Sequence, residues 1–157
     1  MKKQALKAVT MLVSIVALAL MTAVMSNAQS RNQKLRANIP FDFVVGDKTL
    51  AAGEYSVGQV TQDDSGIAVR STESKQSAMR LTSTVQAPAP KTRGMLIFHR
   101  YGSSYYLAQI WTAGSAEGRE ILKSKAERAT ERELAKNPSR GELAQAMETV
   151  TVFAEFR

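Results

Sequence analysis

The segment 94–118 constrains the fold of this chain more than any other stretch. It reads GMLIFHRYGSSYYLAQIWTAGSAEG, with two runs rich in Leu, Ile, Phe, Tyr and Trp around Gly102–Ser104 and a second small-residue break at Ala113–Gly118. Runs of β-branched and aromatic residues bounded by Gly and Ser predict a β-hairpin. The only His, the only Trp and three of the four Tyr residues lie in this segment. If the protein has a binding or catalytic site, we therefore expect it in this segment.

Three further stretches alternate between apolar and polar residues with a period of two, which is typical of half-buried strands. They are Leu35–Val45, Ala78–Val85 and Glu148–Phe156. In the second of these runs, Met79, Leu81 and Val85 share one face. Pro40 cannot donate to a ladder of strand hydrogen bonds, so we expect it near the start of the regular strand or on an edge.

The pattern changes at Ser124, where Ser124-Lys125-Ala126-Glu127 matches a capping box. Strong helix formers follow as far as Asn137-Pro138, which predicts a charged surface helix at about 125–136. The remaining strands are short, and no helices alternate with them. This pattern favours a mainly β fold, an antiparallel barrel or sandwich of about eight short strands with one C-terminal surface helix. The final strand can return to pair with an early one and so remove an exposed edge.

The N-terminus has the pattern of a secretory signal peptide. Three lysines precede the uncharged, mostly apolar stretch Ala8–Met25, and the small residues of Ser26-Asn27-Ala28 predict cleavage after Ala28. An uncleaved membrane anchor is the alternative, because an apolar run of about 18 residues is at the lower limit for a spanning helix. We therefore expect an exported protein, periplasmic or extracellular, with a signal peptide at 1–28, a flexible lead-in at 29–34 and a single β-rich domain at 35–157.

Charge and cysteine content bear on the possible partners and on the source of stability. The formal net charge of +7 falls to +4 once residues 1–28, with three lysines and no acid, are removed. The basic residues of 123–136 alternate with Glu127, Glu131 and Glu133, which is typical of a solvated helix face and argues against a nucleic-acid partner. The chain contains no Cys, so its stability must come from packing and sheet hydrogen bonds.

No catalytic or metal-binding constellation emerges from the sequence. One His and no Cys cannot supply an ordinary zinc site, and no G-x-S-x-G elbow is present. We therefore expect no enzymatic activity, no metal and no cofactor. The competing hypothesis is a small hydrolase or isomerase with a dispersed site that uses His99 and a carboxylate such as Asp42.

The aromatic residues of segment 94–118 either fill a core or line a cleft for a sugar or an apolar ligand. Strict alternation predicts one face with Tyr105, Leu107 and Trp111, and another with Tyr106, Ala108 and Ile110. If there is a ligand site, the candidate residues are those that combine aromatic surface with a hydrogen-bonding group: His99, Tyr101, Tyr106 and Trp111.

The stretch Ile39–Val57, IPFDFVVGDKTLAAGEYSV, resembles the opening of a group of uncharacterised small exported proteins of soil bacteria, notably acidobacteria. The pattern of that group is IPF-x-F, a Gly-containing turn and then L-P-A-G-x-Y-x-V. FHRYG at 98–102 followed by IW at 110–111 is also similar to the group. Ala51 stands where the group has Pro, which leaves that turn less rigid here. The resemblance implies a signal peptide and a β-rich domain, but no established activity or functional residue.

Together these patterns predict an exported, non-enzymatic β-domain. Its expected partner is an envelope protein, a glycan or a small apolar ligand. A membrane-tethered envelope accessory protein is a further alternative, and it depends on whether the N-terminal segment is cleaved.

Overall fold

The computed structural model describes residues 34–61, 65–136 and 148–156, all within one compact unit, Gln33–Arg157. The predicted signal peptide, its cleavage site and residues 29–33 of the lead-in lie outside the described residues. Ten strands and one helix are assigned: β1 (Leu35–Ile39), β2 (Phe43–Val45), β3 (Lys48–Leu50), β4 (Gly53–Gln59), β5 (Gly66–Ser71), β6 (Ser77–Gln86), β7 (Gly94–Tyr101), β8 (Ser104–Trp111), β9 (Glu117–Ile121), α2 (Lys125–Lys136) and β10 (Glu148–Phe156).

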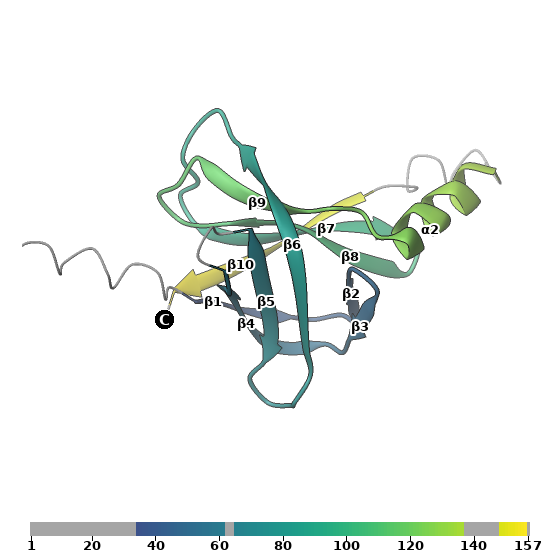
Figure 1. Ribbon diagram of the computed structural model, residues 1–157, viewed down its shortest axis with the longest axis horizontal. Helices are drawn as coiled ribbons and strands as arrows, with labels where there is room; N and C mark the ends of the chain where they lie inside the picture. Colours follow the sequence, from purple (N-terminus) through teal and green to yellow (C-terminus); the bar gives the residue numbers. More distant parts are fainter. Residues whose placement is uncertain (1–33, 62–64, 137–147, 157) are drawn as a thin grey trace, which may run out of the picture. The chain divides into compact units, whose positions relative to one another are not determined.

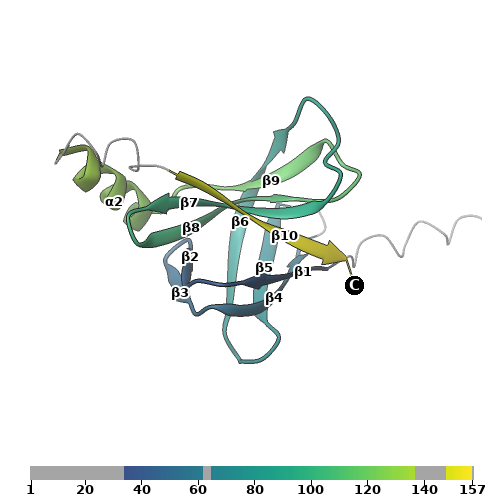
Figure 2. The ribbon, with the colours of Figure 1, turned by 180° about the vertical axis from the view of Figure 1, so that it is seen from behind.

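Eight of these strands close into an antiparallel barrel. Their order is β8-β7-β10-β1-β4-β5-β6-β9, and β9 pairs back onto β8 (Figures 1 and 2). The predicted barrel or sandwich is therefore a barrel, and its closure removes the sheet edges. The final strand does return to an early one, because β10 lies between β7 and β1 with Leu35 opposite Phe156.

The run Leu35–Val45, expected as one strand, is two strands separated at Pro40. The first, β1, lies between β10 and β4, whereas β2 pairs with β3 and, in parallel, with β8 at Val44 and Tyr106. Pro40 has no N–H for the ladder, so the chain can leave the barrel wall here without losing a donor. Gly46, at φ 66°, makes the tight turn between β2 and β3. This break is one reason why the strands number ten rather than about eight.

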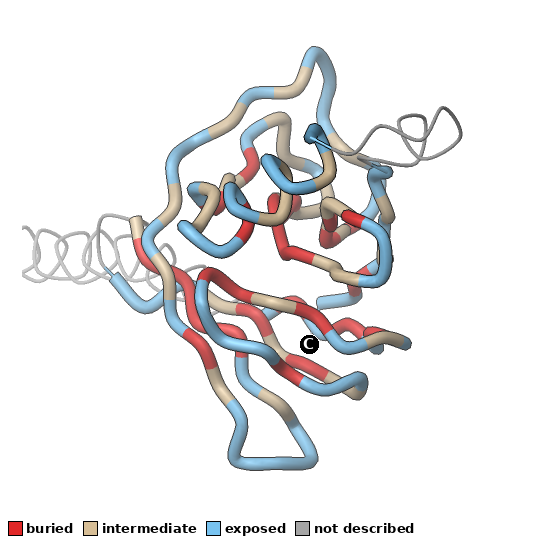
Figure 3. Tube along the Cα trace, turned by 90° about the vertical axis from the view of Figure 1, so that its right-hand side faces the viewer, coloured by how far each residue is buried: buried red, intermediate tan, exposed pale blue. Residues whose placement is uncertain are grey.

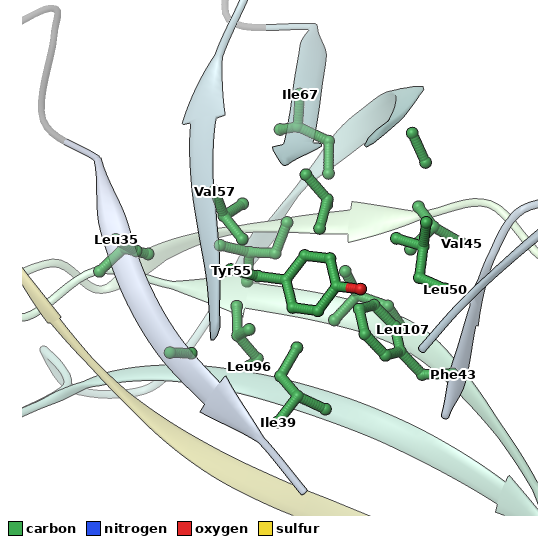
Figure 4. Packing of buried hydrophobic residues seen from close by; sticks show 14 of the residues in the cluster. Leu35, Ile39, Phe43, Val45, Leu50, Tyr55, Val57, Ile67, Leu96 and Leu107 are labelled. Carbon is green, nitrogen blue, oxygen red and sulfur yellow. The ribbon is translucent and has the colours of Figure 1, made fainter. Parts of the chain in front are cut away.

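Side chains from the barrel strands and from β2 and β3 fill the interior. Tyr55 lies in the middle of the cluster, with its ring edge-to-face with Phe43 at 5.0 Å (Figure 4). Phe43 meets Phe98 in the same way at 5.5 Å. The Tyr55 hydroxyl donates to the carbonyl of Ala51 at 2.7 Å, so this buried polar group is satisfied. An eight-stranded barrel is just wide enough for side chains to fill, and here they do.

A β-bulge in β8 overturns the predicted division of its two faces. Ile97 pairs with Gln109 but Phe98 pairs with Leu107, so Ala108 is the extra residue on β8. The bulge reverses the alternation, and Leu107 and Ile110 both point into the core. Trp111 therefore shares the outer face with Tyr106, not the inner face with Leu107.

The alternation of β6 is confirmed, but its large apolar side chains face outward. Figure 3 shows buried and exposed residues alternating along the strands. Ala78 is buried in the core, whereas Met79 is 62% exposed and Leu81 is 68% exposed. Pairing explains this orientation, because Ala78 lies opposite Val69 of the core, which turns the neighbouring positions outward.

Candidate functional site

Three of the four candidate ligand residues come together on the outer face of β7 and β8. His99 lies directly opposite Tyr106 across the two strands, and Tyr101 lies two positions beyond His99 on the same face. The ring centroids of Tyr101 and Tyr106 are 5.7 Å apart, and those of His99 and Tyr101 are 6.3 Å apart, both edge-to-face. The hairpin register therefore builds an aromatic cluster outside the barrel core.

Helix α2 covers this cluster and leaves Tyr101 3% and Tyr106 6% exposed. Polar contacts link the helix to the wall. Oε1 of Glu127 lies 3.1 Å from Nδ1 of His99 and accepts a 3.4 Å hydrogen bond from the Tyr101 hydroxyl. The hydroxyls of Tyr106 and Thr130 are 3.1 Å apart. The cluster is thus closed by a surface helix and is not an open cleft.

The sequence points to Glu127 only as a helix-capping residue, and half of that prediction is confirmed. The hydroxyl of Ser124 accepts a hydrogen bond from the amide of Glu127 at 3.1 Å. The Glu127 carboxylate, however, turns to His99 and Tyr101, and it is the buried residue of the helix. Buried carboxylates need such partners, but only the hairpin register brings them within reach.

The pairing of Glu127 with His99 is the orienting half of an acid–histidine arrangement. Within residues 34–61, 65–136 and 148–156, Glu127 is the one side chain that hydrogen bonds to the His99 ring. Hydrolysis by a nucleophilic mechanism would also need a hydroxyl or thiol at the other ring nitrogen. Asp42, the carboxylate considered with His99 above, instead accepts a hydrogen bond from the amide of Ala52 at 2.8 Å.

Lys123 adds a positive charge at the edge of the cluster. Its ammonium donates to Glu131 at 2.8 Å, and this hydrogen bond is the main reason that its pKa is raised. Burial raises the pKa of Tyr101, and the nearby Lys123 opposes the shift. At neutral pH the cluster therefore holds a neutral phenol beside a cationic lysine.

Trp111, the fourth candidate ligand residue, lies elsewhere on the same outer face. Its indole packs on Gly118, where an added Cβ would come within 2.6 Å of the ring, and the ammonium of Lys91 lies 4.9 Å from its ring centroid. Its Nε1 donates to Gln109 at 3.0 Å, and the side chain is 4% exposed. Trp111 is therefore buried by contacts of its own and does not belong to the aromatic cluster beneath α2.

An open groove, which the sequence did not predict, crosses the outer faces of β4, β1 and β10. Register places Arg36 opposite Glu155 and Asn38 opposite Glu54. The groove, termed the β1 groove below, has a volume of about 500 Å³. Its lining residues are Arg36, Ala37, Asn38, Glu54, Arg93, Phe153 and Glu155.

Phe153 is the exposed apolar element of the β1 groove. Its side chain is 53% exposed, and the guanidinium of Arg93 lies 4.4 Å from its ring centroid. The rest of the lining is polar, with Arg36 and Glu54 paired at 3.6 Å. The signal in the sequence was the outward face of the last strand, where Phe153 interrupts a row of polar residues.

Within the described part of the chain, no cluster of three or more His, Cys, Asp or Glu side chains is arranged to hold a metal ion. No described helix is long and apolar enough to cross a membrane. No protein-family model matches the chain, and no curated protein or solved structure matches it significantly.

Proposed function

We propose that this protein is an exported, non-enzymatic binding domain that holds a neutral glycan in the β1 groove. The observation that carries the proposal is the half-exposed ring of Phe153, set among hydrogen-bonding side chains in an open groove. Ligand sites combine apolar surface with a few convergent polar groups. Of the three partners expected from the sequence, an envelope protein, a glycan and a small apolar ligand, a glycan suits such a lining best.

The chemistry of the groove favours a sugar over an apolar molecule. The C–H face of a sugar ring can stack on Phe153, while its hydroxyls exchange hydrogen bonds with Arg36 and Asn38. Two arginines and two glutamates line the groove, so its formal charge is balanced. A balanced lining gives a neutral ligand no electrostatic penalty and gives an anionic one no net attraction.

The β1 groove is also more accessible than the aromatic cluster. Tyr101 and Tyr106 are almost fully covered by α2, whereas Phe153 remains 53% exposed beside the guanidinium of Arg93. A ligand at the cluster would first have to displace the helix and break the contact between Glu127 and His99. Binding in the groove requires no such step, and a preformed site costs less free energy to occupy.

Calorimetric titration of the purified protein with short neutral oligosaccharides and with uronic-acid oligosaccharides tests this proposal. We expect saturable binding of a neutral oligosaccharide, weakened about tenfold by Phe153→Thr. Phe156→Thr is the matched control, because Phe156 is an exposed phenylalanine of the same strand that does not line the groove. Binding that survives Phe153→Thr unchanged, or that only acidic oligosaccharides show, would contradict the proposal.

Export is proposed on the N-terminal pattern, with which the resemblance to small exported proteins agrees. Expression of the complete chain in a bacterium, cell fractionation and mass spectrometry of the N-terminus test this part. We expect the protein outside the cytoplasm, beginning at Gln29. An intact N-terminus in the membrane fraction would instead support the tethered alternative.

A further inference from the structure

Four of the six large hydrophobic side chains exposed in the described residues gather around β6: two lie on this strand, one directly follows β9 and one directly follows β4. Met79 is 62% exposed, Leu81 68%, Leu122 68% and Val60 41%. These four residues are termed the β6 patch. The other two, Phe153 and Phe156, belong to β10.

Register shows that the β6 patch is continuous. Thr82 pairs with Ile121, which places Leu122 beside Leu81 on the outer face. On the other side Leu81 lies opposite Gly66, where an added Cβ would come within 3.3 Å of the Val60 side chain. Apolar side chains therefore lie on both sides of Leu81, with Leu122 after β9 on one side and Val60 after β4 on the other, which is unusual for a solvent-facing wall.

Two charged residues flank the β6 patch at opposite ends. Arg70 lies opposite Ser77, two residues before Met79 on β6, and Glu120 lies opposite Ser83, two residues after Leu81. Arg70 is on the strand to one side of β6 and Glu120 is on the strand to the other. The two charges are thus diagonal and equally far from the centre of the patch. Neither forms an ion pair with another residue in the described parts of the chain.

We propose that the β6 patch binds a second copy of this chain in a two-fold symmetric dimer. A symmetric contact requires a surface that complements itself. A two-fold axis in the plane of the contact, through the centre of the patch, places Arg70 of one copy against Glu120 of the partner subunit, twice. The same operation packs Met79 between the two leucines of the other copy.

The charges also favour this occupant over a lipid surface. Anionic headgroups would attract Arg70 and repel Glu120, so the two charges oppose each other at a lipid surface, whereas a second copy pairs both of them. The dimer does not depend on the proposed glycan site, because the β1 groove lies on the other side of β4, over β1 and β10.

Sedimentation velocity of the purified protein over a range of concentrations tests the proposal. We expect a monomer–dimer equilibrium whose dissociation constant rises at least tenfold in Leu81→Lys, because a buried contact is replaced by a charge. Phe153→Lys introduces the same charge at an exposed apolar residue outside the β6 patch, and we expect it to leave the equilibrium unchanged.

A charge exchange tests the symmetry itself. Arg70→Glu and Glu120→Arg should each weaken the dimer roughly two- to fivefold or more, since exposed ion pairs contribute modestly and like charges then repel. A mixture of these two variants should restore dimers. In the mixed dimer the two substituted positions face each other with opposite charges, and the unsubstituted Arg70 and Glu120 still pair. Arg132→Glu on the exposed face of α2 is the control for the change in net charge.

Three results would overturn the proposal. The wild-type protein could stay monomeric at every concentration tested. A dimer could form that Leu81→Lys does not weaken, or that the variant mixture does not restore. Finally, the wild-type protein could remain monomeric and co-sediment with anionic phospholipid vesicles through Leu81, which would make the patch a lipid-binding surface.

Discussion

Two walls of this barrel each carry several large apolar or aromatic side chains on their outer faces, but within the described residues only one of the two is covered. On β7 and β8, helix α2 leaves Tyr101 3% and Tyr106 6% exposed. On β6, Met79 and Leu81 remain more than 60% exposed. The outer face of a barrel has no core of its own, so apolar groups there need a second layer. The described part of the chain supplies that layer for one wall, and we propose that a second copy supplies it for the other.

The covering helix is itself largely polar. Its hydrogen bonds to the wall come from Glu127 and Thr130, and its one buried residue is a glutamate. A polar helix can cover aromatic residues here because each of those residues presents a hydroxyl or an imidazole to it. Met79 and Leu81 offer no such group, and only an apolar surface can cover them.

The largest expected difference between the walls is in stability. Tyr106→Ala should lower the free energy of unfolding by about 2–4 kcal/mol, because it removes a buried aromatic ring and the hydrogen bond between Tyr106 and Thr130. Leu81→Ala should change it by no more than about 0.5 kcal/mol in dilute solution. Urea unfolding of both variants measures the difference, and equal losses would mean that the two walls are equally covered.

The next effect concerns the polar link between helix and wall. Glu127→Ala should cost about 1–3 kcal/mol, because His99 and Tyr101 lose the oxygen that both contact. Glu127→Gln retains a hydrogen-bond acceptor and should lower the free energy of unfolding by less. Glu133→Gln, on the exposed side of the same helix, is the control. The measurement is urea unfolding followed by far-ultraviolet circular dichroism. A Glu127→Ala variant as stable as the control would show that this link does not hold α2.

A smaller loss is expected at the start of α2. Ser124→Ala removes the acceptor for the Glu127 amide and should cost about 1 kcal/mol, concentrated in the helix. Hydrogen exchange should show faster exchange in 125–136 and little change in the barrel strands. Ser103→Ala, in the exposed turn between β7 and β8, serves as the control. Faster exchange throughout the barrel would show that the helix and the barrel open as one unit.

The smallest effect is a loss of stability in alkali. The pKa of Tyr101 is raised from 10.0 by burial, and that of Lys123 is raised from 10.5, chiefly by its hydrogen bond to Glu131. A pKa raised on folding stabilises the folded state below the unfolded value, and this stability is lost as pH rises through the folded value. Stability should therefore fall above about pH 10.

Denaturant unfolding between pH 8 and about 12 measures this loss. Tyr101→Phe should reduce the slope of stability against pH, but Tyr55, whose pKa burial also raises, keeps part of it. Unfolding that is independent of pH in this range would contradict the assignment of these groups as protonated in the fold.

Much of the fold could be predicted from the sequence because local patterns specify it. The strands at 78–85 and 148–156, the helix at 125–136 and the return of the last strand to an early one are confirmed, whereas the run Leu35–Val45 is two strands. Barrel closure could not be predicted, because it also needs β6 to pair with β9, and the whole β7–β8 hairpin lies between these two strands in the sequence. No local pattern records such a pairing.

One prediction about faces was wrong and one face was left without a direction, and each has a specific cause. The bulge at Ala108 reverses the alternation of β8, and nothing about an alanine in a strand indicates an extra residue. In β6 the period was correct, but the direction was set by its register with β5. Apolar residues are usually inside, so an apolar row that faces outward is the kind of feature that sequence patterns misplace.

The candidate site was predicted only in part. His99, Tyr101 and Tyr106 do lie together, because strand register makes them neighbours. Their cover by α2 and the link to Glu127 required tertiary structure. Phe153 and Arg93 are distant in sequence and meet only because β10 pairs beside β7. The groove that they help to form therefore has no sequence signature of its own.

An amide chemical-shift map of the protein tests the central claim, that binding uses the uncovered walls and that the covered wall is structural. The map is recorded during dilution and again during titration with a neutral oligosaccharide. Dilution should shift signals of β5, β6 and β9, and the oligosaccharide should shift β1, β4 and β10, with His99, Tyr101 and Tyr106 unchanged in both. Shifts confined to His99, Tyr101, Tyr106 and α2 would contradict the account and move the binding site beneath the helix.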